Sequence, residues 1–104
     1  MEKITGIGID IVSINRIEKL YNQYKEKFTK KIFTSREIEE AIKKGHFYQT
    51  LSGKFSAKEA FIKAVNLKIL DLREIEVLSD ENGKPFINYQ EKQYTLLSIT
   101  HEKE

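Results

Sequence analysis

Hydrophobic residues recur with clear periods in the first third of this 104-residue chain. Residues 4–12 predict a strand, because isoleucine occupies every second position from 7 to 11 and Asp10 falls on the opposite face. Apolar side chains then recur at spacings of three and four, which predicts a helix capped by Ser13 and reaching Phe28. The chain is therefore expected to begin with a strand and a long amphipathic helix.

Two further helices are predicted in the middle of the chain. Thr34 and Glu37 have the spacing of a capping box, and Gly45 is placed to end that short helix. Residues 47–66 carry a stripe of large apolar side chains opposite several alanines, so we expect a longer helix that is buried nearly all round. Four charged residues fall within this helix: Lys54, Lys58, Glu59 and Lys63.

The last third of the chain has the pattern of strands. Apolar residues alternate with glutamates over 74–77, Asn82-Gly83 predicts a hairpin turn of the I′ type, and residues 86–89 return. A final strand is expected over residues 94–101. A strand, then helices, then a run of strands indicate an α+β fold, an antiparallel sheet with helices packed on one side, in a single domain over residues 1–104.

Composition narrows the classes of site and partner. The chain has no cysteine and only two histidines, so a metal would be held by oxygen ligands. The 18 basic and 16 acidic residues leave a net charge of +2, spread without the dense patch of a nucleic-acid binder. No apolar run reaches the roughly 18 residues of a membrane span, and no signal segment is visible. We therefore expect a soluble, cytoplasmic protein with no nucleic-acid or membrane partner.

Two carboxylates are candidates for metal binding. Glu59 lies on a helix that we expect to be buried, so it needs a partner, and Lys63 at i+4 is the ordinary structural one. Asp10 has a structural interpretation too, as a cap or a turn residue. Together they offer hard oxygen ligands beside several lysines, the setting in which proteins hold Mg²⁺. His101 ends the last strand and suits either a phosphate contact or an ordinary surface position.

Four segments together resemble a known family: Gly-Ile-Gly-Ile-Asp-Ile-Val at 6–12, Gly-Lys-Phe-Ser-Ala-Lys-Glu-Ala-Phe-Ile-Lys-Ala at 53–64, Glu-Asn-Gly-Lys-Pro at 81–85 and Ser-Ile-Thr-His at 98–101. They resemble, in order and separation, the holo-[acyl-carrier-protein] synthases, the small bacterial 4'-phosphopantetheinyl transferases. The resemblance covers essentially the whole chain. It implies the fold of that transferase family.

The resemblance also implies a reaction. Members of this family transfer 4'-phosphopantetheine from coenzyme A to a serine of apo acyl carrier protein, releasing adenosine 3',5'-bisphosphate, in support of fatty acid biosynthesis. By position, Asp10 and Glu59 resemble the Mg²⁺ ligands, and Lys63 resembles the residue near the coenzyme A phosphates. His101 resembles a histidine that contacts the nucleotide from a neighbouring subunit of a homotrimer. Arg16 resembles a basic residue that meets the acidic helix after the carrier serine.

The chain departs from the family pattern at three places. Lys54 stands where an arginine is usual, and it is expected to contact phosphate as a point charge without the bidentate fork. His46 lies in a region that is often basic, where we expect weaker attraction of the 3'-phosphate near neutral pH. Relatives usually continue past Glu104 into another apolar strand, and its absence is expected to expose a sheet edge.

The chemistry of the residues leaves some questions open. Either Glu59 or a metal-bound water could accept the proton of the attacking serine. A non-catalytic, mildly basic α+β module that binds acidic protein or RNA is an alternative function, with Asp10 and Glu59 in structural ion pairs. A metal-dependent phosphate-ester hydrolase is a second alternative, which would consume coenzyme A without carrier protein.

Overall fold

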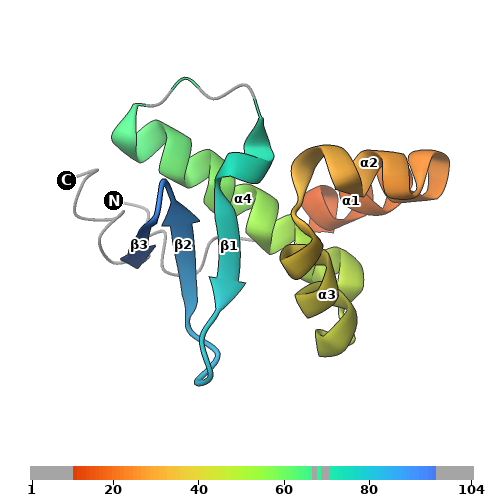
Figure 1. Ribbon diagram of the computed structural model, residues 1–104. Helices are drawn as coiled ribbons and strands as arrows, with labels where there is room; N and C mark the ends of the chain where they lie inside the picture. The colour runs from red at the N-terminus through yellow and green to blue at the C-terminus, as the bar shows by residue number, and fades with distance from the viewer. Residues whose placement is uncertain (1–10, 67, 69–70, 96–104) are drawn as a thin grey trace.

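The structure is a computed structural model that describes residues 11–66, 68 and 71–95. Within these residues, four α-helices, one short 3-10 helix and three strands follow in order: α1 (Ile11–Tyr24), α2 (Glu26–Ile32), α3 (Ser35–Lys44), α4 (Phe47–Val65), η2 (Leu72–Glu74), β1 (Glu76–Ser79), β2 (Pro85–Tyr89) and β3 (Lys92–Thr95). The strands form one antiparallel sheet in the order β1-β2-β3, and α4 runs along one face of it (Figure 1). The predicted α+β class is confirmed.

Helix α4 belongs to two hydrophobic cores. Its C-terminal half contributes Ala57 and Phe61, which pack with Ile75, Val77 and Ile87 against the sheet. Its N-terminal half contributes Leu51 to a second core formed with the shorter helices, whose other buried members are Ile17, Phe28, Phe33 and Ala41. In Figure 1 the helices α1, α2 and α3 accordingly gather beside β1, around one end of α4. Burying apolar surface in both cores fixes α4 as the link between sheet and helices.

The first predicted helix is two helices. Lys25 has a φ of 51° and separates α1 from α2, although no glycine or proline marks the break. This turn lets Phe28 of α2 reach the helical core, where it is buried. Ser13 lies within α1, so the predicted cap is wrong, and residues 11 and 12 are helical where the strand 4–12 was expected to end. The rest of that strand lies outside the described residues.

The prediction for α3 is confirmed in detail. The Thr34 hydroxyl accepts a hydrogen bond from the Glu37 backbone N–H, and the Glu37 carboxylate accepts one from the Thr34 N–H, as a capping box requires. Gly45 ends the helix with a φ of 78°, in the left-handed region where a side chain would be strained. Helix α4 also has the predicted extent and ends at Asn66 in the left-handed conformation.

The hairpins differ from the prediction in their turns. The loop between β1 and β2 is centred on Asp80, whose carboxylate accepts from the backbone N–H groups of Asn82 and Lys84. Gly83 alone in this loop has positive φ, so Asn82-Gly83 is not the predicted I′ turn, which needs two such residues. Two positive φ values occur instead at Gln90 (50°) and Glu91 (66°), the two-residue connection between β2 and β3.

The predicted last strand is represented by β3, and the part of it beyond Thr95 lies outside the described residues. No helix in the described part of the chain has the length and apolar character needed to cross a membrane.

Candidate functional site

The exposed side of α4 carries two of the predicted site residues. Glu59 and Lys63 lie four positions apart, which places both on one face of the helix, and both are exposed. The expectation that α4 is buried nearly all round is therefore wrong on this side. Because Glu59 is exposed, its charge does not require a partner, and it forms no ion pair with Lys63. Within the described residues, Glu59 forms no hydrogen bond or ion pair, so its carboxylate is free to meet a ligand.

The charged residues that α4 does bury are Lys54 and Lys58. Lys54 is 5% exposed, and its ammonium donates to Glu40 of α3 at 2.6 Å and to the backbone oxygen of Val77 at 2.6 Å. This inward position commits the side chain to α3 and β1. It gives no support to the expected contact between Lys54 and a phosphate in solvent.

Lys58 occupies a fully buried position one helical turn further along. Its Nζ donates to the Glu37 carboxylate at 2.9 Å and to the backbone oxygens of Ile32 (2.9 Å), Leu72 (2.8 Å) and Ile75 (2.6 Å). Glu37 is buried to the same extent, so a complete ion pair lies inside the molecule. Such a pair is tolerated because its lone pairs and protons are satisfied by further hydrogen bonds.

Burial and pairing act in opposite directions on these groups. Burial raises the pKa of the Glu37 carboxyl, against the lowering effects of Lys58 and of the Val77 backbone N–H. Burial likewise lowers the pKa of Lys58, against the raising effect of Glu37. Four oxygen acceptors surround Nζ, so the ammonium form, whose three N–H groups share these oxygens, satisfies more of them than the two N–H groups of a neutral amine would.

Glu40 responds differently because it is less deeply buried. Burial on its own would raise the pKa of Glu40, but the hydrogen bond from Lys54, the backbone N–H of Ser79 and the charges of Lys54 and Lys44 outweigh it. The net effect is a pKa below the ordinary value. Glu40 therefore remains a carboxylate to lower pH than a free glutamate does.

The two glutamates of α3 also close the outer edge of β1, the edge that faces away from β2. Glu37 accepts a hydrogen bond from the Val77 N–H at 2.8 Å, and Glu40 accepts one from the Ser79 N–H at 2.9 Å. Lys54 donates to the Val77 carbonyl between them. Side chains of α3 and α4 thus supply the partners that another strand would otherwise supply.

Sequence reasoning missed this network, although one signal for it was present. Lys54 and Lys58 are spaced from Leu51 by three and seven positions, which places them on its buried face. The sequence pattern around Glu37 predicts only its place in a capping box. Its partner lies 21 positions away in the chain, so the pairing depends on how α3 packs against α4.

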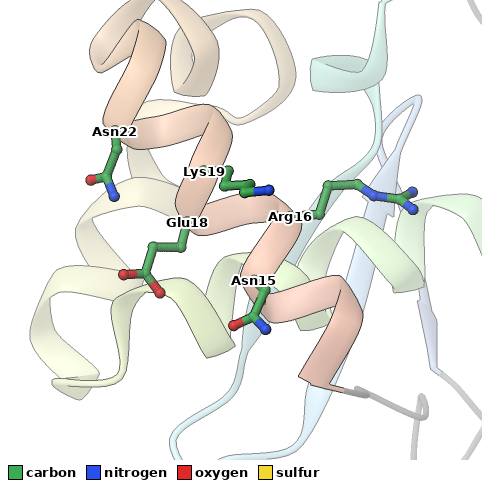
Figure 2. A pocket seen from close by; sticks show the side chains of 5 residues that line it. All are labelled: Asn15, Arg16, Glu18, Lys19 and Asn22. Carbon is green, nitrogen blue, oxygen red and sulfur yellow. The ribbon is translucent and has the colours of Figure 1, made fainter.

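Arg16 lies on the exposed surface of α1. A hollow of about 520 Å³ is lined, among the described residues, by Asn15, Arg16, Glu18, Lys19 and Asn22 of this helix. Figure 2 shows Arg16 projecting from one flank of the helix and Glu18 and Asn22 from the other. The guanidinium forms no ion pair with described residues, so it is available to an acidic partner.

The remaining predicted site residues are placed as follows. His46 precedes α4 at its N-cap position, is exposed and makes no side-chain capping bond. Asp10 and His101 lie outside the described residues. Among the residues that are described, no three acidic, histidine or cysteine side chains gather into a metal-binding group. The structure brings Glu59 and Lys63 to one face, separates Lys54 from them by burial, and leaves the pairing of Asp10 with Glu59 a prediction.

Comparison with known proteins identifies the family to which this chain belongs. Residues 6–103 match the model of the 4'-phosphopantetheinyl transferase superfamily. The chain belongs to this family, as the resemblance of its four segments implied. The match spans the segment that forms α4 and both ends of the described structure.

Curated relatives and a solved structure agree with this assignment. Holo-[acyl-carrier-protein] synthase of Halothermothrix orenii is 38% identical over 96% of this chain and 90% of its own length. The synthase of that name from Bacillus mycoides is 42% identical over 97% of this chain and 88% of its own. The crystal structure of holo-[acyl-carrier-protein] synthase from Neisseria meningitidis superposes with a TM-score of 0.66 at 35% identity, covering 90% of this chain and 74% of that one.

Proposed function

We propose that this protein transfers 4'-phosphopantetheine from coenzyme A to a serine of apo acyl carrier protein, releasing adenosine 3',5'-bisphosphate. Holo acyl carrier protein would then serve fatty acid biosynthesis in the cytoplasm. Family membership and the names of the relatives support the reaction class. The observation that carries the proposal within this structure is that Glu59 and Lys63 lie four positions apart on the exposed side of α4, neither paired with any described residue.

The donor set suits Mg²⁺. Glu59 offers an uncommitted, solvent-accessible carboxylate, and carboxylate oxygens are the ligands this hard cation prefers. In the proposed site Glu59 and Asp10 hold the ion. The bound cation would supply positive charge to the pyrophosphate of coenzyme A. Lys63 adds a second positive charge on the same helix face, where it stabilises the negative charge that develops on the departing phosphate.

Binding of the two substrates is assigned to other parts of the chain. Arg16 on α1 is proposed to meet an acidic helix of the carrier protein, since its guanidinium is exposed and unpaired among the described residues. His46, exposed before α4, and His101 are proposed contacts for the nucleotide. We further propose a homotrimer in which His101 reaches the site of a neighbouring subunit. Lys54 supports α4 through its pair with Glu40.

A transfer assay tests the proposed function. Apo acyl carrier protein, coenzyme A and Mg²⁺ are incubated with the enzyme, and the products are measured by chromatography of adenosine 3',5'-bisphosphate and mass spectrometry of the carrier. We expect both products in equal amounts, and loss of both when a chelator removes the metal. Release without carrier protein would indicate the hydrolase, and no release under any condition would indicate the binding module.

Substitution of Glu59 makes the same assay specific for the site. Glu59→Gln keeps the shape of the side chain but removes the charge, so we expect transfer to fall by about a hundredfold or more. Circular dichroism and the melting temperature should match wild type, because Glu59 has no described partner to lose. Glu39→Gln, an exposed glutamate of α3, is the matched control. Near wild-type transfer in Glu59→Gln would contradict the metal-ligand role.

A further inference from the structure

The buried Glu37–Lys58 pair is adjacent to the proposed site without facing it. Both side chains are 0% exposed, and Lys58 immediately precedes the exposed Glu59 in α4. Buried ion pairs often contribute little net stability compared with apolar residues of similar size. A contribution to stability alone therefore does not explain why the protein buries this pair. Its position next to Glu59 points to a second role.

The pair joins α4 to four other segments at one point. The acceptors of Lys58 are the last carbonyl of α2 (Ile32), the carboxylate of Glu37 in α3, the first carbonyl of η2 (Leu72) and the carbonyl of Ile75 before β1. The distances from Nζ to these oxygens lie between 2.6 and 2.9 Å. An ammonium bonded in this way has little freedom to move, because any shift lengthens several charge-assisted hydrogen bonds.

Anchoring Lys58 fixes the direction of the next side chain. Successive residues of an α-helix turn by about 100° and rise by about 1.5 Å, so inward placement of Lys58 directs Glu59 to the flank of α4. Lys63 lies four residues beyond Glu59 on that same flank. A rotation of α4 about its axis would carry both groups away from a common ligand.

The apolar neighbours of Lys58 constrain the rotation of α4 about its axis less tightly than its hydrogen bonds do. Ala57 and Phe61 pack against the sheet, but dispersion contacts are weak individually and have no directional requirement. Hydrogen bonds to fixed carbonyls impose distance and angle together. The Glu37–Lys58 pair, together with the Lys54–Glu40 pair one turn earlier, adds directional information that the apolar core does not contain.

We propose that the Glu37–Lys58 pair has a positioning role in the transfer reaction. It sets the rotation of α4 about its axis so that Glu59 and Lys63 contact the same ligand. This inference rests on the proposed function. The pair touches neither substrate nor metal and acts through the backbone of α4. Its loss lowers the rate of the bound complex more than it weakens binding of coenzyme A.

The test compares the two ion pairs that join α3 to α4. Lys58→Met removes the anchoring ammonium, and the double variant Lys58→Met with Glu37→Gln also removes the buried charge left behind. Glu40→Gln is the control, because Glu40 pairs with Lys54 one turn earlier and also accepts a backbone N–H of β1. Steady-state transfer is measured well below each melting temperature, and Mn²⁺ binding to the enzyme alone is followed by its electron paramagnetic resonance signal.

We expect a separation of stability from rate. Lys58→Met should lose about tenfold or more in kcat, with the KM for coenzyme A changed by less than about threefold, because misplacement of reacting groups by about 1 Å is costly. Its affinity for Mn²⁺ should fall in parallel. The double variant should melt at a higher temperature than Lys58→Met and remain equally slow. Glu40→Gln should keep kcat within about twofold of wild type.

Two results would overturn the inference: unchanged kcat per folded molecule in Lys58→Met, or recovery of kcat in step with melting temperature in the double variant. If Lys58→Met does not fold, Glu37→Gln takes its place, and a kcat equal to that of Glu40→Gln overturns the inference. A wild-type protein without transfer activity instead defeats the proposed function. In that case the Mn²⁺ measurement decides the inference, since unchanged affinity in Lys58→Met excludes positioning of Glu59.

Discussion

Lys58 and Glu59 are neighbours in the sequence, but α4 places them in opposite environments. Lys58 is enclosed by four oxygen acceptors, whereas Glu59 is exposed and has no described partner. The rotation of about 100° per residue accounts for the contrast. A structural lysine and a candidate catalytic glutamate can therefore share one short motif.

Glu40 provides a pH prediction that concerns stability. Its pKa in the folded protein lies below the ordinary value of 4.5, despite burial, because Lys54 and the Ser79 N–H favour the carboxylate. The resulting stability is present above the unfolded pKa and is lost as pH falls through the folded pKa. We expect Glu40→Gln to melt about 4–8 °C below wild type at pH 7, for a loss of about 1 kcal/mol.

The difference between wild type and Glu40→Gln should shrink below pH 4.5 and vanish once the wild-type carboxyl is protonated. Thermal melts followed by circular dichroism between pH 7 and pH 3 measure it. Glu39→Gln, which changes an exposed glutamate of the same helix, controls for the loss of one charge. A difference that is constant with pH would show that the lowered pKa of Glu40 does not contribute to stability.

Among the elements, α3 and α4 were predictable and the α1–α2 break was not. The capping box and the C-terminal glycine of α3 are signals that lie within a few residues of the chain. The apolar periodicity that predicts α4 also lies within one continuous segment. Lys25 adopts a positive φ without any such signal, and packing of Phe28 in the helical core compensates for it. Gln90 and Glu91 also adopt positive φ without a glycine to signal it. Their conformation is set by the pairing of β2 with β3 on either side of the turn.

The candidate site, too, has features that the sequence predicts and features that depend on packing. Glu59 and Lys63 could be singled out because their types and spacing suit metal and phosphate chemistry. That Glu59 is exposed, however, follows from the direction in which α4 packs on the sheet. The buried Glu37–Lys58 pair needs contact between α3 and α4, which no local pattern reports.

Helix α1 carries a prediction about carrier-protein docking. Arg16→Glu reverses a charge that we propose meets an acidic helix, so kcat/KM for the carrier should fall about tenfold at low salt. The KM for coenzyme A should stay within about twofold, and added salt should narrow the loss, since screening weakens exposed charges. Kinetics with each substrate varied measure both effects.

The control for Arg16→Glu is Lys27→Glu, which makes the same change of charge on the exposed surface of α2. A general dependence on net charge would affect both variants equally. An equal loss of affinity for coenzyme A in Arg16→Glu would instead contradict a role confined to carrier docking.

The described part of the molecule has two cores that share α4, and it carries Glu59 and Lys63 of the candidate site on the surface of that helix. Such a site is open to completion by a second subunit. If Glu59 comes from one subunit and His101 from the next, Glu59→Ala and His101→Ala should each be nearly inactive alone. Random mixing of the two variants in equal proportion should restore about a quarter of all sites in a cyclic arrangement.

The subunit experiment unfolds the two variants together, refolds them, verifies mixed trimers by native mass spectrometry and measures transfer. Each variant refolded alone is the control. Recovery to roughly a quarter of wild-type activity supports a site shared between neighbours. Mixed trimers that remain as inactive as their parents would place both residues in one subunit's site or remove one of them from it.

The closed outer edge of β1 affects how the protein behaves at high concentration. An open strand edge offers rows of N–H and C=O groups to any extended chain, and is a common starting point for aggregation. Here Glu37, Glu40 and Lys54 occupy those groups at Val77 and Ser79. A second molecule would have to break two ion pairs before its own strand could add to the sheet. Acid that neutralises the two carboxylates weakens this protection, so concentrated solutions should aggregate through β1 when acidified and remain clear near neutral pH.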